Sequence, residues 1–307
     1  MRTKKRKTST LTNETAINNI ELFRADLINN AFSENTAKGY CNDIKLYACW
    51  CNKENNNDKN INTLTRDCII SYKDYLKRIM KSDAKTINHK LSSLRKYNEY
   101  LIEQNKMDTI VIIKKDMCKI QTEFANPTNI TNTEVDTFLN DIKNDNKNTA
   151  KRDYAIVMLL AYTGLRISEC LSIKFNDIDW RNKELTITGK GNKQRTVYLS
   201  DKVCDILNDY IQNNRTKEYY GDNINSEYVF ISSRSQKLTT QRINQIFDEY
   251  NNKIHPHSLR HWFCTHALES NMNLHEIANQ AGHTNIQTTM RYTNPTKDMM
   301  RAKMNLL

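Results

Sequence analysis

The second half of the chain carries six side chains that together could break and remake a phosphodiester bond. A tyrosine hydroxyl can attack phosphorus and keep the bond energy in a phosphotyrosine ester. Arginines can hold the non-bridging oxygens through forked hydrogen bonds, which strengthen as charge builds in the transition state. A lysine can protonate the leaving 5′ oxygen, and histidines can orient groups or carry protons. The candidate catalytic residues are Arg166, Lys190, His257, Arg260, His283 and Tyr292.

Such a site needs neither a metal ion nor ATP, because the arginines neutralise the phosphate and the covalent ester conserves energy. We therefore expect no cofactor, and the sequence has no GxxxxGK[ST] phosphate-binding loop. The stretch HPHSLRH raises a metal alternative, since His257 and His261 have the i, i+4 spacing of zinc ligands on a helix. No carboxylate stands between them, and Arg260 would place a fixed cation beside the metal. We expect no metal site.

Glycine and proline are scarce, at six and three residues, and most of them flank the candidates. Gly164 lies two residues before Arg166, and Gly282 directly precedes His283. Such residues let the backbone turn tightly to present a side chain. Each candidate alone also has an ordinary structural explanation; Arg166, for example, could simply pair with Glu169 one helical turn later. Only the complete set indicates a phosphodiester site.

Composition limits the class of protein. The 307 residues suffice for two domains, and the formal net charge is +11. Residues 1–122 hold 23 basic and 14 acidic side chains (+9), whereas residues 123–307 hold 23 and 21 (+2). A basic first half suits a module that grips a polyanion, although surplus lysine can also serve solubility alone. No apolar run approaches a membrane span and no signal peptide is evident, so we expect a cytoplasmic protein with reduced cysteines.

The elements that must position the candidates fall into two groups. Apolar residues at helical spacing predict four helices before a polar stretch that contains Pro127. After it, two alternating runs around the turn GKGNKQ predict a β-hairpin among further helices. The expected helices are 14–31, 36–54, 65–80, 84–105, 132–143, 150–173, 201–213, 239–253, 258–270, 274–281, 285–292 and 296–307, and the strands are 184–188 and 195–199. The fold class is therefore mainly α with a small antiparallel sheet. We place the linker at 123–130, between a domain of residues 1–122 with a basic tail (1–12) and a domain of residues 131–307.

At the candidate residues the chain closely resembles the tyrosine recombinases, or phage-integrase family, nearest to its short Xer-type and transposon-encoded members. The matching segments are TGLRISECLSIKFNDID with Arg166, TGKGNKQRTVYL with Lys190, HPHSLRHWFCTH with His257 and Arg260, and AGHTNIQTTMRYT with His283 and Tyr292. All six positions hold the family's preferred residue in the family's order. SENTAKGYCNDIKLYACW and KTINHKLSSLRKYNEYL look like the second and fourth helices of the family's N-terminal SAM-like core-binding domain.

The resemblance implies a two-domain clamp around DNA, with a catalytic domain that cleaves and rejoins strands through a 3′-phosphotyrosine and a Holliday junction. It implies a homotetramer on an inverted-repeat core site of double-stranded DNA, with residues 296–307 docked into a neighbouring protomer or, alternatively, capping their own core. A DNA-bending accessory protein or a second recombinase could be a further partner. The expected DNA contacts of the N-terminal domain are Thr36, Lys38, Tyr40, Lys85, His89, Lys90 and Arg95.

The resemblance also assigns supporting roles. Glu169 would orient groups near Arg166, whereas His261 and His266 would be structural. A DNA-binding accessory protein that no longer cuts and a relaxing topoisomerase are the alternative functions, and the intact candidate set disfavours the first of them. Integration, excision and resolution use the same chemistry, so the sequence leaves the biological role open.

Overall fold

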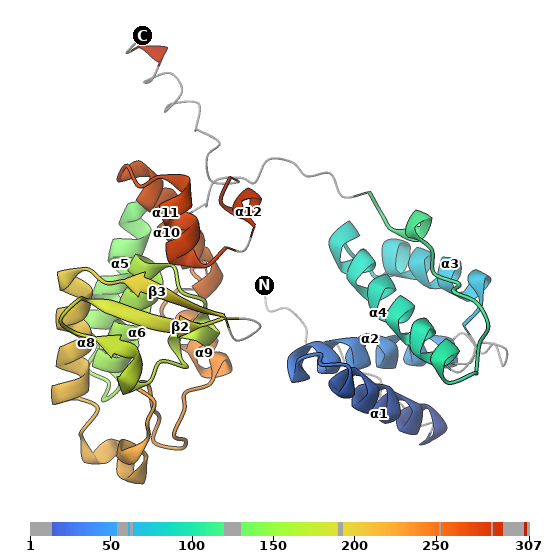
Figure 1. Cartoon of the computed structure of the whole chain (residues 1–307), viewed down its shortest axis with the longest axis horizontal. Helices are drawn as coiled ribbons and strands as arrows, with labels where there is room; N and C mark the ends of the chain where they lie inside the picture. Colours follow the sequence, from blue (N-terminus) through green and yellow to red (C-terminus); the bar gives the residue numbers. More distant parts are fainter. Residues whose placement is uncertain are drawn as a thin grey trace. The chain divides into compact units, whose positions relative to one another are not determined.

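The computed structural model describes residues 14–53, 61, 64–119, 130–189, 193–251, 253–283, 285–290 and 304–305. The chain divides into two compact units, Met1–Gln121 and Thr122–Leu307 (Figure 1). Several predictions lie outside the described residues: Lys190, Tyr292, the tail 1–12, nearly all of the linker 123–130 and most of the segment 296–307. No helix in the described part of the chain is long and apolar enough to cross a membrane.

The first unit is built from the four predicted helices, α1 (Glu14–Asn29), α2 (Glu34–Lys53), α3 (Arg66–Asp74) and α4 (Ala84–Glu103). The predicted helix 65–80 changes type near its end, because α3 continues as a π-helical turn, η1 (Tyr75–Ile79). Asp83 begins α4 as its cap, with its carboxylate accepting from the Thr86 amide at 2.7 Å. A short 3-10 turn, η2 (Lys114–Asp116), follows.

Aromatic side chains dominate the core of this unit. Phe23, Tyr47, Tyr72 and Tyr97 are fully buried and come from all four helices. Neighbouring rings meet edge to face, as in the Tyr47–Tyr72 pair with centroids 5.1 Å apart. Removing these large rings from water is the main stabilising contribution to so small a bundle.

The second unit combines a three-stranded antiparallel sheet with helices that pack around the buried helix α6 (Ala150–Thr163). The sheet order is β1 (Ile178–Asp179), β2 (Glu184–Thr188), β3 (Gln194–Tyr198), and the β2–β3 register pairs Leu185 with Val197. Leu185, Ile187 and Val197 point inward and the threonines between them outward, as the alternating sequence predicts, whereas Arg195 shares the inward face with Val197. The helices are α5 (Asn132–Lys143), α6 (Ala150–Thr163), α7 (Ile167–Cys170), α8 (Asp201–Asn213), α9 (Thr240–Tyr250), α10 (Pro256–Glu269), α11 (Leu274–Ala281) and α12 (Ile286–Met290). Figure 1 shows α11 beside the β2–β3 hairpin.

Two predictions for this unit are corrected. The helix expected over 150–173 is two helices, because the chain turns at Gly164 with a φ of 66°. A side chain at that position would collide with the ring of Phe263, so a glycine ends α6 there. Second, the predicted two-stranded hairpin has a third strand, β1, which is too short for a periodic signal, and the 3-10 segments η3 (Phe175–Asp177) and η4 (Glu218–Asn225) lie outside the predicted elements.

Candidate active site

The turn after α6 places Arg166 at the start of α7. Its backbone N–H donates to Glu169 Oε2 at 2.9 Å, and its Nη1 donates to Glu169 Oε1 at 2.9 Å. Its Nη2 donates to the carbonyl of Gly282 at 3.1 Å, which ties the turn to the end of α11. Nearly half of the Arg166 side chain, 47%, remains exposed. The expected pairing with Glu169 is therefore present, and it orients a guanidinium that still reaches solvent.

Arg260 is buried, with only 5% of the residue exposed. Its Nη1 donates to the carbonyl of Gly164, while its Nη2 has no acceptor among the described residues. Burial, and next the nearby charge of Arg166, lower the pKa of Arg260 to about 10. A buried N–H without an acceptor is costly, and an anion would offset both this cost and the repulsion between the arginines.

Three histidines lie near these arginines. His283 follows α11, and its Nδ1 lies 2.7 Å from Thr289 Oγ1. Burial, and next the charges of Arg260 and Arg166, lower the pKa of His283 to about 4, so this ring is neutral at pH 7. His257 and His261 lie one turn apart on α10 with their Nε2 atoms 3.0 Å apart, a hydrogen bond in which one nitrogen must be unprotonated. The structure thus places His261 in direct contact with a predicted catalytic residue.

Glu169 is the acidic centre of the site. Its carboxylate, 7% exposed, accepts from Arg195 Nη1 at 3.0 Å and Nη2 at 2.9 Å as well as from Arg166. Burial pushes the pKa of Glu169 upward, but the hydrogen bonds from Arg195 and Arg166 outweigh it, so the pKa lies below its usual value. Arg195 was not among the predicted site residues, although the alternation along β3 places it on the same inward face as Val197.

A cavity of about 860 Å³ opens beside these groups, between α7, the β2–β3 hairpin and the end of α11. Arg166, Glu169, Arg195 and His283 line it. The end of the β2–β3 hairpin lies at the rim of this cavity, where the Gly189 amide donates to the Lys193 carbonyl at 2.8 Å. The structure thus brings together three of the six predicted catalytic residues, Arg166, Arg260 and His283, while His257 lies about one turn before Arg260 on α10.

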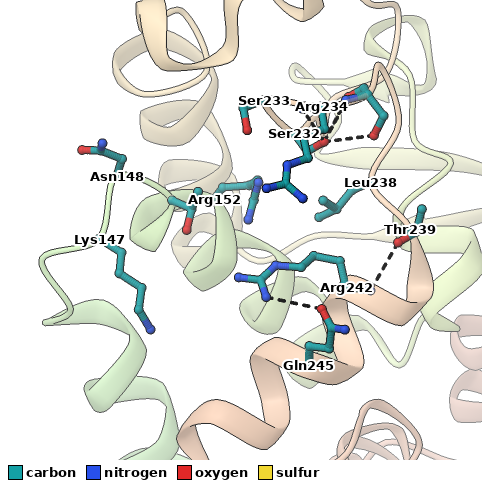
Figure 2. Close-up of a pocket in the computed structure, with 12 residues that line it drawn as sticks. Lys147, Asn148, Arg152, Ser232, Ser233, Arg234, Leu238, Thr239, Arg242 and Gln245 are labelled. Carbon is teal, nitrogen blue, oxygen red and sulfur yellow. Dashed lines mark hydrogen bonds between the residues drawn. The ribbon is translucent and has the colours of Figure 1, made fainter.

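A second cavity, of about 740 Å³, lies at the other end of α6 (Figure 2). Figure 2 shows Arg152, Arg234 and Arg242 extending toward one another, with Lys147 nearby. Hydroxyl and amide side chains complete the wall, and none of the described residues that line it is acidic. Three of its four cations pair with acids beside the cavity: Arg152 with Asp153, Arg242 with Glu249, and Lys147 with Asp145 and Glu249. Arg234 is exposed. This cavity was not predicted, since its residues come from two segments that lie far apart in the sequence.

The expected DNA contacts of the first unit differ in their surroundings. Lys38, Lys85 and His89 are exposed. Arg95 Nε lies 3.3 Å from Glu99 Oε1. The ring of Tyr40 packs against that of Phe32. The Thr36 hydroxyl shares a hydrogen bond with the Ser33 hydroxyl at the start of α2. Lys90 differs most: its side chain is only 15% exposed and donates to the buried Asp43 at 2.7 Å.

Comparisons with known proteins agree with this arrangement. Residues 128–299 match the Phage integrase family, and residues 20–105 match the Phage integrase, N-terminal SAM-like domain. A TnP I resolvase of Bacillus thuringiensis is 46% identical over 276 residues, covering 90% of this chain and 94% of its own. The tyrosine recombinase XerC of Oceanobacillus iheyensis is 28% identical over 279 residues, covering 87% of each chain.

Solved structures share the fold. The XerH site-specific recombinase bound to palindromic difH substrate superposes with a TM-score of 0.68 at 18% identity, covering 96% of this chain and 90% of that one. The Tn1549 transposon integrase in complex with transposon right end DNA gives a TM-score of 0.65 at 21% identity, covering 94% and 99%. Since the family profile spans more than half of the chain and a relative is nearly half identical along most of it, this protein belongs to the phage integrase family and is a tyrosine recombinase.

Proposed function

We propose that this enzyme is a site-specific DNA recombinase that cleaves and rejoins strands through a 3′-phosphotyrosine on Tyr292, with a Holliday junction between the two strand exchanges. The observation that carries this proposal is the meeting of Arg166 and Arg260 with His283 around two glycine carbonyls. The two arginines repel each other and Arg260 keeps one N–H without an acceptor among the described residues. A phosphodiester, bound between them, offsets both costs.

In this mechanism the arginines bind the two non-bridging oxygens of the scissile phosphate. Their hydrogen bonds strengthen as the phosphorus becomes pentacoordinate and negative charge grows on those oxygens. Glu169 holds the Arg166 guanidinium in place before the substrate arrives, so little reorganisation is needed during the reaction.

The covalent step exchanges one ester for another. The Tyr292 Oη–P bond forms while the P–O5′ bond breaks, and the DNA strand leaves with a free 5′ hydroxyl. The tyrosine proton passes to His257, whose Nε2 shares a hydrogen bond with His261 Nε2 in which one of the two nitrogens is unprotonated. Lys190 gives a proton to the departing O5′. His283, neutral at pH 7, donates a hydrogen bond to a phosphate oxygen rather than adding a third charge. Rejoining reverses these steps.

DNA binding would use both units. The exposed basic residues of α2 and α4, among them Lys38 and Lys85, fit contacts to phosphates. The second cavity adds Arg234 and Arg242 as candidate contacts to a phosphate away from the cleavage point. We further propose a homotetramer on an inverted-repeat core site, with residues 296–307 docking in trans, acting in the cytoplasm. The 46% identity to a resolvase favours resolution of joined DNA molecules over integration or excision.

The test uses nicked duplexes tiled from the DNA that flanks the gene, incubated with the protein in EDTA. We expect a protein–DNA adduct that resists denaturation and that is absent with Tyr292→Phe. Specific binding without any adduct would favour a DNA-binding accessory protein. An adduct that survives the Phe substitution would show that another side chain is the nucleophile. Relaxation of supercoiled DNA that lacks any target site would favour a topoisomerase.

A further inference from the structure

Arg195 forms contacts with three separate elements. It lies on β3, and its two terminal nitrogens grip both oxygens of Glu169 on α7 at 3.0 and 2.9 Å. Its Nη2 also lies 3.4 Å from the carbonyl of Ala281, the last residue of α11. The planar fork of an arginine allows this bidentate grip, which a lysine could not reproduce.

The guanidinium also lies flat against Gly282. A Cβ at that position would come within 2.6 Å of Arg195 Nε and 2.5 Å of Cζ. Gly282 has a φ of 70°, so glycine is required both by the backbone conformation and by the closeness of Arg195. The next residue is His283, whose position therefore depends on this contact.

Arg195 differs from the two arginines assigned to the phosphate. Arg166 is nearly half exposed, and Arg260 keeps a terminal N–H without an acceptor among the described residues. In Arg195 both terminal nitrogens already serve Glu169 and Ala281, only 18% of the side chain is exposed, and the remaining Nε is buried against Gly282. Both terminal nitrogens of Arg195 are thus held by protein oxygens, and the nitrogen that lacks an acceptor among the described residues, Nε, lies against Gly282.

We infer that Arg195 is a positioning residue for strand cleavage. It locks Glu169, and through it Arg166, to the hairpin that carries Lys190, and it fixes the α11 end that presents His283. This inference rests on the proposed function, because it assigns those neighbours their roles in cleavage. Arg195 acts on the rate of the covalent step and leaves the affinity for DNA unchanged.

The experiment measures single-turnover adduct formation on a nicked duplex at saturating DNA, together with the DNA dissociation constant. Arg195→Gln should slow cleavage by about 10²-fold, the cost of a small misplacement of reacting groups, while the dissociation constant stays that of the wild type. Arg195→Lys should recover only part of the rate. Arg181→Gln, an exposed arginine beside the same sheet, is the matched control and should cleave normally.

A double-variant cycle separates positioning from general damage to the fold. In the wild-type background Gly282→Ala should slow cleavage by pushing the guanidinium away; in Arg195→Ala the same change should cost less, because the collision is gone. Independent effects of the two substitutions on the cleavage rate, which multiply, would overturn the inference. An Arg195→Gln enzyme that cleaves at the wild-type rate would also overturn it. So would an Arg195→Gln enzyme whose DNA affinity falls in proportion to its cleavage rate. A wild type that forms no adduct would instead overturn the proposed function itself.

Discussion

Each unit of the molecule contains a buried carboxylate surrounded by basic side chains, but the two clusters differ in their balance of charge. In the first unit Asp43, 10% exposed, accepts from Lys90 Nζ and Ser93 Oγ, each at 2.7 Å, and His89 Nε2 lies 3.4 Å away. One carboxylate there meets one permanent cation. In the second unit the single carboxylate of Glu169 lies among three guanidiniums, those of Arg166, Arg195 and Arg260.

The charge balance of each cluster indicates whether the cluster stabilises the fold or binds a ligand. A balanced cluster such as that of Asp43 satisfies its own charges and holds α2 against α4. An unbalanced cluster cannot satisfy itself: the pKa values of Arg260 and His283 are lowered first by burial and then by the positive charges of the neighbouring arginines. Excess buried charge of one sign therefore indicates a ligand of the other sign, here a phosphate.

The largest effect should come from reducing the excess charge of the Glu169 cluster. We expect Arg260→Ala to lower the rate of adduct formation by about 10²–10³-fold, the usual cost of losing one preorganised donor to a transition state. Arg260→Lys should be nearly as slow, because a lysine lacks the forked geometry. Arg181→Lys, at an exposed arginine outside both cavities, serves as the control. A normal cleavage rate in Arg260→Ala would remove Arg260 from the mechanism.

Substitutions in the Asp43 cluster should change the stability of the protein rather than the cleavage rate. Lys90→Met leaves the Asp43 carboxylate without its cation, and we expect the free energy of unfolding to fall by about 1–3 kcal/mol. Lys85→Met, on the exposed face of the same helix, should leave stability unchanged and weaken DNA binding. Urea unfolding and fluorescence anisotropy with a labelled duplex measure the two quantities. The opposite pattern would make Lys90 a DNA contact and contradict its structural role.

In the second cavity Arg234 is exposed, whereas Arg242 is paired with Glu249 at 2.9 Å. If Arg234 meets a phosphate, Arg234→Gln should lower the slope of log Kd against log salt by about one, and Arg242→Gln should lower it less. The affinity loss should be the same for specific and random duplexes, because phosphates carry no sequence information. Arg181→Gln is the matched control. Unchanged slopes in both variants would show that this cavity does not meet DNA.

The smallest effect concerns the pH dependence of stability. Because the pKa of His283 is about 4 in the folded protein and 6.5 ordinarily, the unfolded chain binds a proton in this window that the folded chain does not. Stability should therefore fall as pH drops from 6.5 to 4. In His283→Asn this contribution disappears, so its Tm should decrease less between pH 7 and pH 4.5. An equal decrease in both proteins would mean that His283 titrates normally.

Much of the local structure follows from the sequence, because it depends on neighbours along the chain. Apolar spacing, the Asp83 cap and the alternating hairpin are local signals, and they predict α4, α5, α8 and the β2–β3 pair to within a few residues. The helix end at Gly164 was not predicted although glycine is a local signal for it; the Phe263 ring, which a side chain there would meet, lies almost a hundred residues later.

The sequence by itself determined which chemical groups are present, their order and the family they indicate; Lys190 and Tyr292 remain predictions at that level. Only the tertiary structure decided which charged side chains contact one another. It placed Arg195 on Glu169, bound Lys90 to Asp43 rather than leaving it free for DNA, and gathered Lys147, Arg234 and Arg242 around one cavity. Periodicity and spacing cannot report such contacts, because they join residues far apart in the chain and depend on how the helices and the sheet pack.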